Sequence, residues 1–511
     1  MRADRQVSGV VVSTVAVVTL AAFAAVAPTA QAVTATCAGA ATGGEWRSYG
    51  HDNANTRTQP DETTLGTAAA ATLAPAWSAT VAASGPSTSG GVPANQLNGT
   101  PVVADGCVFV GTSDGHVIAL NADTGGLVWR SGQLGDPAAP GLGGLVNGSV
   151  VVDAGKVIVL VNQLGGPYAA ALDENDGTQL WRSPAVSTYA NAYTNANPGV
   201  AGGTLLIGFS APEGDPHGQG GFALISTTDG ALEKVTDTIP PADQALGYAG
   251  GGIWTAPAID ANAGYAYFGA GNPSSKQMEH RNTNAILKID LHPGATFGQI
   301  VSSYKGQVDQ YELPQLTKTP VCTASEGTPL DDFPLDDPAC GQLDLDFGAT
   351  PNLFSDGHGH ELVGELQKSG YYHAANADTM VSAWANPIGL PCALCNADST
   401  AVDNGAIFAV GTPGGVMMSL TTSTGGLRWA GPVGDGVHYG SVSTADGVVY
   451  TLDSLGCLDA FDASTGVPLL HRPVSVDSGQ LAAGLTSSGV AIARHTVYVE
   501  AGNAVVAYRA A

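Results

Sequence analysis

Apolar and polar residues alternate along most of the chain in short runs that end at glycine turns. Each unit contains two such runs, then D-x-x-T-G or a remnant of it, then an apolar or Trp position. The alternation predicts strands with one buried face, and the Asp-Gly and Thr-Gly steps predict hairpin turns. Eight copies of this unit occupy 103–129, 148–181, 201–235, 257–304, 352–384, 402–429, 445–470 and 486–509.

A single hairpin unit cannot bury its own faces, so the copies have to pack side by side around an axis. The sequence therefore predicts an all-β fold, an eight-bladed β-propeller with few helices. The last copy lacks a clear outer strand before Ala511, whereas the stretch from Trp46 to Trp77 precedes the first copy and holds two strand-like pieces. We expect this N-terminal segment to complete the last blade and close the ring.

The beginning of the chain has the pattern of an export signal. Arg2 and Arg5 precede an uncharged run from Val7 to Ala27, and Ala30-Gln31-Ala32 fits a small-residue cleavage site. We expect residues 1–32 to be a signal peptide and 33–511 to be a single propeller domain, secreted or otherwise extracytoplasmic. The alternative is an uncleaved membrane anchor, because the apolar run is close to spanning length. No later stretch is long and apolar enough to span a bilayer.

Charge excludes one class of partner. The chain has 18 Lys and Arg against 44 Asp and Glu, a formal net charge of −26. Phosphate backbones are bound by clustered basic residues, so nucleic acid is excluded as a partner. Only 12% of the residues are charged, and 69 Gly and 30 Pro favour short strands joined by tight turns.

The seven cysteines favour structural disulfides. Cys392 and Cys395 are close enough in sequence to bridge each other, and Cys322 and Cys340 flank an acidic insertion that they could staple. A third group, Cys37, Cys107 and Cys457, leaves one odd thiol, and the sequence does not say which. Asn396 follows Cys395, so the pair fails the C-x-x-C-H signature of covalent haem, and no second close pair supports a zinc site.

The repeat element resembles that of a known family. LNADTGGLVW (120–129) and FDASTGVPLL (461–470) are similar to the repeat of the pyrroloquinoline-quinone (PQQ) dehydrogenases. The resemblance extends over residues 44–509 and implies a quinoprotein-type propeller. The Trp and Gly of the element are expected to pack and turn within each blade, so the element specifies architecture and not activity.

A second set of residues, outside the repeat, bears on activity. GGGIWTAPAIDANAGYAYFGAGNP (250–273) resembles the family segment that carries an aromatic floor under the quinone and a calcium-binding Asn. The resemblance assigns the floor to Trp254 and a calcium ligand to Asn272. A flat quinone needs an aromatic face, and Ca²⁺ prefers hard oxygen ligands. The alternatives are a core Trp between blades and a turn residue before Pro273.

Upstream, LLIGFSAPEG (205–214) resembles the family strand that ends in a calcium-binding Glu. This implies Glu213 as a metal ligand and Ser210 as a hydrogen-bonding partner of the cofactor. The same loop carries an insertion, and the alternative for Glu213 is a solvated acidic side chain.

Downstream, DLDFGATPNL (344–353) and LQKSGYYHA (366–374) narrow the resemblance to the polyvinyl-alcohol-dehydrogenase-like branch. The resemblance implies that Asp346 is the catalytic base and a calcium ligand, and that Lys368 is the cation beside the reactive quinone carbonyl. A base must be ionised and close to the alcohol proton, and a Lys can donate to an oxygen that gains negative charge. The alternatives are turn residues for Asp344 and Asp346 and a surface charge for Lys368.

The sequence departs from the family at several points. It has no vicinal Cys-Cys pair, it has Gly252 where relatives often have a Thr, and no Arg near the first blade is clearly placed to hold the quinone carboxylates. With no haem motif, an electron acceptor would have to be external. The resemblance implies an exported PQQ- and Ca²⁺-dependent alcohol dehydrogenase acting on a secondary alcohol or a hydroxyl-bearing polymer such as polyvinyl alcohol. The alternatives are a non-catalytic cell-surface scaffold and a polymer-binding propeller.

Two further motifs favour ordinary turns. His358 and His360 lie in a Gly-rich segment with no third metal ligand in view. GTSDG (111–115) matches G-x-S-x-G, but a strand is predicted to follow it where a nucleophile elbow needs a helix.

Overall fold

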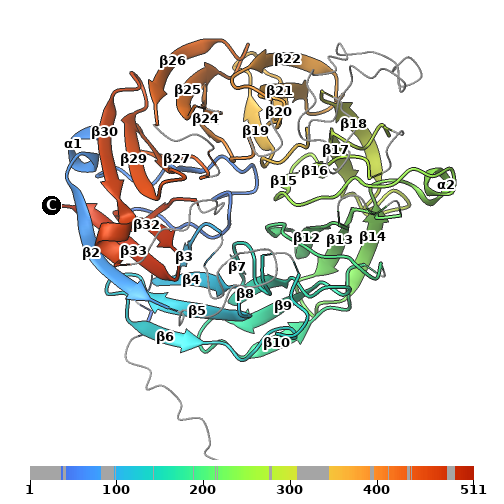
Figure 1. Cartoon of the computed structure of the whole chain (residues 1–511), viewed down its shortest axis with the longest axis horizontal. Helices are drawn as coiled ribbons and strands as arrows, with labels where there is room; N and C mark the ends of the chain where they lie inside the picture. The colour runs from blue at the N-terminus through green and yellow to red at the C-terminus, as the bar shows by residue number, and fades with distance from the viewer. Residues whose placement is uncertain are drawn as a thin grey trace, which may run out of the picture. The chain divides into compact units, whose positions relative to one another are not determined.

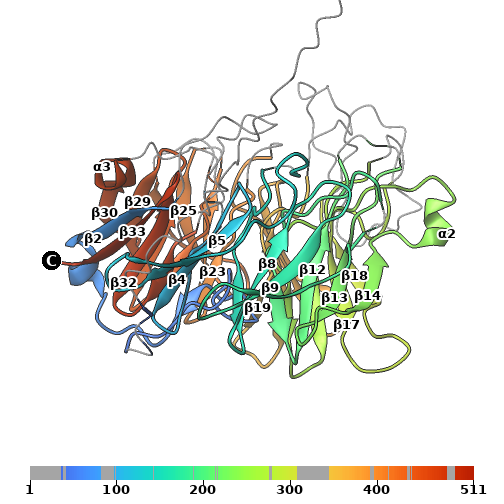
Figure 2. The same ribbon diagram turned by 90° about the horizontal axis from the view of Figure 1, so that it is seen from below.

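The described strands form eight sheets arranged around a central axis, antiparallel except for the short strand β1 (Figure 1). The computed structural model describes residues 36–511 except 38, 40–41, 82–96, 98, 142, 188, 213–214, 216, 275–278, 308–344, 392–395, 413, 434–437, 439 and 480–488. The first strands of successive blades contact one another around the whole ring, so they are the innermost strands. Figure 2 shows the same sheets from below, turned by 90°. The prediction of an all-β, eight-bladed propeller is confirmed.

The strands of blades 1 to 4 are β3 (Val102–Ala104), β4 (Cys107–Thr112), β5 (His116–Asn121) and β6 (Leu127–Arg130); β7 (Val151–Asp153), β8 (Lys156–Val161), β9 (Tyr168–Asp173) and β10 (Gln179–Arg182); β11 (Gly199–Ala201), β12 (Thr204–Phe209), β13 (Gly221–Ser226) and β14 (Leu232–Asp237); and β15 (Ala258–Asp260), β16 (Tyr265–Gly269), β17 (Ala285–Asp290) and β18 (Ile300–Lys305).

The strands of blades 5 to 8 are β19 (Asn352–Ser355), β20 (Glu361–Leu366), β21 (Tyr371–Asn376) and β22 (Ser382–Pro387); β23 (Ala401–Asp403), β24 (Ala406–Gly411), β25 (Val416–Thr421) and β26 (Leu427–Pro432); β27 (Ser443–Ala445), β28 (Val448–Leu452), β29 (Cys457–Asp462) and β30 (Pro468–Pro473); and β31 (Ala491–Ala493), β32 (Thr496–Ala501), β33 (Ala504–Ala510) and β2 (Leu73–Thr80). The eight repeats predicted from sequence coincide with these blades.

The N-terminal strand β2 closes the ring. It pairs antiparallel with β33, from Leu73 opposite Ala510 to Thr80 opposite Ala504, and so supplies the outer strand that the last copy lacks. Figure 1 shows the blue β2 beside the red β33. The predicted closure is therefore confirmed for β2.

The earlier part of the N-terminal segment has a different place from the one expected. Residues 46–58 run along the inside of the ring, and β1 (Thr58–Gln59) pairs in parallel with β27. Backbone N–H groups of six innermost strands donate to carbonyls of this segment; the donors are Val103, Val152, Ile259, Leu353, Val402 and Thr444. Apart from β27, which pairs with β1, the innermost strands have no further strand on their axial side. The segment therefore satisfies donors that would otherwise be buried without partners.

The Trp of the repeat packs between blades, which corrects the expectation that it packs within its own blade. Each indole lies on the glycine turn of the next blade, and its Nε1–H donates to a carbonyl of that turn at 2.9–3.1 Å. The pairs are Trp77 on Gly125, Trp129 on Gly177, Trp181 on Gly230, Trp384 on Gly425 and Trp429 on Gly466. A Cβ on any of these glycines would lie 2.6 Å or less from the indole, so only glycine permits the contact.

Helices are few and short, as predicted: α1 (Thr67–Ala70), α2 (Pro241–Gln244) and α3 (Val474–Ser478). Within the described ranges, no helix has the length and apolar character needed to cross a membrane. The serine of GTSDG lies in the hairpin turn between β4 and β5, and His358 and His360 lie in the turn between β19 and β20, both as predicted.

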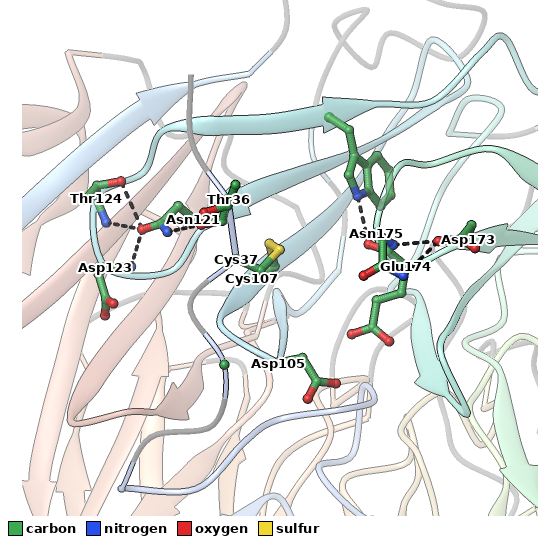
Figure 3. The surroundings of a disulfide bond; sticks show 12 residues. Thr36, Cys37, Asp105, Cys107, Asn121, Asp123, Thr124, Asp173, Glu174 and Asn175 are labelled. Carbon is green, nitrogen blue, oxygen red and sulfur yellow. Dashed lines mark hydrogen bonds between the residues drawn. A yellow bond between two sulfur atoms is a disulfide. The ribbon is translucent and has the colours of Figure 1, made fainter. Parts of the chain in front are cut away.

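One disulfide lies within the described residues. It joins Cys37 to Cys107 at the start of β4, and Cys457 is a buried free thiol, which resolves the pairing that the sequence left open. Figure 3 shows the bridge beside the turn of Asn121, whose side chain accepts the N–H groups of Asp123 and Thr124. The expected pairs Cys322–Cys340 and Cys392–Cys395, and the expected signal peptide 1–32, lie outside the described residues.

Candidate functional site

Five of the six residues singled out from the sequence lie at one end of blades 3 to 5. Within a blade, the first strand starts where the antiparallel second strand ends. Trp254 and Asp346 precede the first strands β15 and β19. Ser210, Asn272 and Lys368 follow the second strands β12, β16 and β20. The topology therefore brings together residues that are up to 158 positions apart in the sequence. The sixth, Glu213, lies outside the described residues.

The centre of the site is the carboxylate of Asp346. Its Oδ1 accepts the backbone N–H of Asn272 at 2.5 Å, and its Oδ2 lies 3.2 Å from Nζ of Lys368. The Asp346 and Lys368 side chains are only 5% and 8% exposed. Ion pairs in such a shielded place are screened much less than surface pairs. The carboxylate is therefore held in one orientation by a charge and a backbone donor from two different blades.

The indole of Trp254 lies beside this ion pair. Nζ of Lys368 is 5.1 Å from the centre of the indole, within the range of a cation–π contact. The edge of the ring lies against Gly348, where a Cβ would collide with Cη2 and Cζ2. The side chain is half-buried. Trp254 thus has a fixed position and an aromatic surface next to the charged groups, as a floor for a flat ring requires.

A small cavity of about 40 Å³ connects these groups. It is lined by residues of blades 3 to 5, among them Tyr193, Ser210, Trp254, Asn272 and Asp346. The hydroxyl of Ser210 is buried and has no hydrogen-bond partner among the described residues. A volume of this size holds a single ion with a water molecule and is too small for a tricyclic ring.

The donor set of the cavity fits a hard cation. Asp346 offers a carboxylate, Asn272 an amide oxygen and Ser210 a hydroxyl, which are the oxygen ligands that Ca²⁺ takes in proteins. The residues present therefore fit a calcium ion at this position.

Gly252, the departure noted in the sequence, has a steric reason. A Cβ at this position would lie 2.7 Å from Oγ of Ser210, closer than real Cβ atoms approach. A Thr here would displace the Ser210 hydroxyl from the cavity. In this chain the two positions are matched: a glycine at 252 leaves room for a hydroxyl at 210.

Asn55, which the sequence analysis did not single out, ties the site together from inside the ring. Its Nδ2 donates to the carbonyl of Pro257 at 2.9 Å and to that of Pro351 at 3.1 Å. These carbonyls follow Trp254 and Asp346 by three and five residues. Asn55 has a left-handed backbone with φ of 54° and is 3% exposed. No local pattern marks this role, because it depends on the path of residues 46–58 through the ring.

Glu365 is a second residue that the sequence analysis passed over. It lies on β20, three residues before Lys368, and is fully buried against Gly269 of blade 4. Neither carboxyl oxygen has a hydrogen-bond partner among the described residues. Burial raises the pKa of Glu365 well above its ordinary value, because the charged form is disfavoured away from water. The single charged residue within the apolar run of 362–366 was the available signal.

The repeat pattern decides the family. The family described as "Outer membrane protein assembly factor BamB" (PQQ_2) matches residues 61–272 and 376–511, more than half of the chain. The chain belongs to the PQQ_2 family. The resemblance to PQQ-type propellers stated from the sequence is thus confirmed. The PQQ_2 match leaves out residues 273–375, the part that carries Asp346 and Lys368.

Individual relatives of this PQQ_2 propeller include dehydrogenases. The chain is 25% identical to the polyvinylalcohol dehydrogenase of Sphingopyxis sp. (strain 113P3) over 80% of its own length and 66% of that protein. In structure it is similar to the quinohemoprotein alcohol dehydrogenase of Comamonas testosteroni, with a TM-score of 0.67 and 16% sequence identity. The match covers 91% of this chain and 80% of the Comamonas protein. A europium-containing methanol dehydrogenase is also similar in structure, with a TM-score of 0.67 and 15% sequence identity. The match covers 89% of this chain and 89% of that chain. At these identities the structural likeness shows the fold alone.

Proposed function

We propose that this protein is an exported alcohol dehydrogenase that depends on PQQ and Ca²⁺. The observation that carries the proposal is the carboxylate of Asp346, held between Lys368 and the Asn272 N–H at the edge of a polar cavity beside Trp254. A buried acid–lysine pair with fixed geometry, an aromatic surface and oxygen donors for a cation are together what alcohol oxidation by a quinone requires.

The cofactors would be held by residues of blades 3 to 5. Asn272, Asp346 and Glu213 are the proposed ligands of Ca²⁺, and Trp254, Ser210 and Lys368 the proposed contacts of the quinone. When bound, the quinone would supply the hydride acceptor and the calcium ion would supply a Lewis acid that polarises the quinone carbonyl. The part of the chain is to bind and orient the cofactors, because the quinone itself would carry the redox chemistry.

The chain's own residues handle the proton. Asp346 accepts the hydroxyl proton on a carboxylate oxygen, since its two existing partners fix the orientation of both oxygens. Lys368, 3.2 Å away, donates toward the oxygen on which negative charge develops and remains next to the protonated acid. The burial of both side chains excludes bulk water from the proton transfer.

The proposed substrate is a secondary alcohol or a hydroxyl-bearing polymer such as polyvinyl alcohol. The similarity to a polyvinylalcohol dehydrogenase supports this choice. Because the sequence has no C-x-x-C-H motif, the proposed electron acceptor is an external protein or dye. The N-terminal pattern of residues 1–32 supports export.

A non-catalytic scaffold is the second candidate, and one observation favours it. The match to the PQQ_2 family omits residues 273–375, so the propeller repeat does not depend on Asp346 or Lys368. A scaffold or polymer-binding propeller of this family predicts no quinone binding at all.

Calorimetric titration with PQQ, with and without Ca²⁺, separates the two candidates. The dehydrogenase predicts Ca²⁺-dependent binding and dye-linked oxidation of a secondary alcohol. Asp346→Asn should leave PQQ binding largely intact and lower turnover by roughly a hundredfold or more, because it removes the base. Trp254→Ala should weaken PQQ binding at every Ca²⁺ concentration.

The matched control is Asp378→Asn. Asp378 is exposed, lies in the same blade as Lys368, and is 3.5 Å from Lys288 of the neighbouring blade. This variant should change neither binding nor turnover. Absence of heat on addition of PQQ and Ca²⁺ to the parent protein would contradict the dehydrogenase. Normal turnover of Asp346→Asn would move the base to another residue.

A further inference from the structure

A second cluster of metal-binding side chains lies in blade 7, on residues that the proposed function does not use. Asp453 follows β28, Cys457 begins β29, and His471 lies on β30. One ligand atom of each lies within 4.8 Å of the others. Among the described residues, this is the group of three His, Cys, Asp or Glu side chains whose possible ligand atoms all lie this close to one another.

The strand register explains why these side chains meet. Cys457 and Asp459 are two residues apart on β29 and so lie on the same face of the sheet. Asp459 is directly opposite His471 on β30, and its other neighbour is Thr451 on β28. The tight turn from β28 to β29 brings Asp453 back beside Cys457, where Oδ1 of Asp453 accepts the Cys457 N–H at 2.7 Å.

The cluster already has the arrangement of a metal site with an orienting carboxylate. Asp459 Oδ1 lies 2.7 Å from Nδ1 of His471, which fixes the imidazole ring. Carboxylates commonly hold metal-binding histidines in this way. Asp459 is only 2% exposed, and its Oδ2 has no hydrogen-bond partner among the described residues.

Two of the three side chains are shielded from solvent. Asp453 is 4% exposed and Cys457 is 8% exposed. A cation held between them would therefore meet ligand atoms for which bulk water competes little.

We propose that Asp453, Cys457 and His471 bind a divalent first-row transition-metal ion of the Zn²⁺ class, with Asp459 as the residue that positions His471. A sulfur, a nitrogen and a carboxylate oxygen select this class over Ca²⁺ or Mg²⁺, which prefer oxygen alone. A tetrahedral zinc site places its ligand atoms roughly 3.5 Å apart, so small rotamer changes suffice. His471 is 61% exposed, so the ion can enter from solvent and keep a water as fourth ligand.

The test uses the full protein, stripped with chelator and titrated with Co²⁺ and then Zn²⁺. Co²⁺ should bind one equivalent and give a thiolate-to-metal charge-transfer band, and Zn²⁺ should abolish the band by displacement. The bound metal should also protect Cys457 from alkylation, measured by mass spectrometry. Binding without the band, or alkylation that is unchanged by Zn²⁺, would overturn the assignment of Cys457.

Variants assign the ligands. His471→Gln and Cys457→Ser should each lower Co²⁺ affinity at least a hundredfold. Asp459→Asn should lower it about 10- to 100-fold, because His471 loses the carboxylate that positions its ring. His292→Gln is the matched control, because its Nδ1 lies 2.7 Å from Asp290 in the same exposed setting but with no cysteine beside it. Because His471 is exposed, the His471→Gln variant should fold normally. Unchanged Co²⁺ affinity of this variant would refute the site.

This site is independent of the proposed dehydrogenase. Asp346→Asn should leave the cobalt band unchanged, and excess Ca²⁺ should not compete with it. The two proposals can therefore fail separately.

Discussion

Asp346 and Lys368 are joined twice: the Lys368 Nζ lies 3.2 Å from Asp346 Oδ2, and the Lys368 backbone N–H donates to the Asp346 carbonyl at 3.0 Å. The side-chain contact provides the charge pair, and the backbone contact fixes the distance between the segment before β19 and the end of β20. The pair is therefore a structural connection within blade 5 as well as the centre of the candidate site.

The first prediction concerns the stability of this pair. Lys368→Met leaves a buried carboxylate without its cation and should destabilise the protein by about 3–5 kcal/mol, as broken buried ion pairs do. The double variant Asp346→Asn, Lys368→Met removes both charges and should lose less than the sum of the single losses. Urea unfolding in the presence of a calcium chelator measures all four proteins. Additive losses would show that the side chains do not interact.

The second prediction concerns Asn55. Asn55→Gly keeps the left-handed backbone but removes the amide that holds the Pro257 and Pro351 carbonyls. We expect a loss of about 2–4 kcal/mol from two unsatisfied buried carbonyls. We also expect at least a tenfold loss of PQQ affinity, because Trp254 and Asp346 lose a common support. Asn53→Gly is the control, since Asn53 is exposed and contributes a backbone carbonyl.

The third prediction is a pH dependence of stability from Glu365. Its pKa is raised in the folded state, so the folded protein keeps a proton that the unfolded chain releases. The associated stability is complete below the unfolded pKa of about 4.3 and is lost as the pH rises toward the folded pKa.

The Glu365→Gln variant is neutral at every pH and isolates this contribution. Its unfolding free energy relative to the parent should increase by about 1.4 kcal/mol per pH unit above pH 4.5. Urea unfolding between pH 4 and pH 7 measures the difference. Glu361→Gln, an exposed residue at the start of the same strand, should show no such slope. A constant difference for Glu365→Gln would mean that Glu365 is ionised in the folded protein.

The fourth prediction concerns the disulfide between Cys37 and Cys107, which closes a loop of 70 residues. In the chain-entropy model a loop of this length contributes about 4 kcal/mol. The double variant Cys37→Ala, Cys107→Ala should therefore unfold at lower urea, with a loss of about 2–4 kcal/mol. Dithiothreitol should destabilise the parent more than the double variant, by about the same amount. Equal sensitivity of both proteins would place the effect in another disulfide.

Sequence patterns predicted the blades because each repeat carries its own evidence. The alternation is local and recurs in all eight copies, and a turn glycine such as Gly125 or Gly466 occurs in most of them. The ring closure by β2 was also predictable, since a missing outer strand requires a donor from the other end of the chain. Resemblance to a family pointed to Ser210, Trp254, Asn272, Asp346 and Lys368. The structure places the first four around one cavity and Lys368 3.2 Å from Asp346.

Other features depend on contacts that no local pattern records. Asn55 lies in an irregular segment, and its contacts with Pro257 and Pro351 follow only from the path of that segment inside the ring. The position of each Trp on the next blade was misjudged because the repeat does not state which copy its Trp contacts. The Cys457 cluster needs the register of β29 and β30, which places His471 opposite Asp459.

The pairing of β2 with β33 also sets the order in which the molecule can be assembled. Leu73 and Ala510 are more than 400 residues apart, so the last blade has no outer strand until β33 has been synthesised. Contacts over such a separation form late and slowly, and until then an unpaired edge remains open to aggregation. Loss of β33 (Ala504–Ala510) would leave β2 without a partner and the last blade with β31 and β32 alone. Deletion of this one strand would therefore remove the pairing that holds residues 73–80 in the ring.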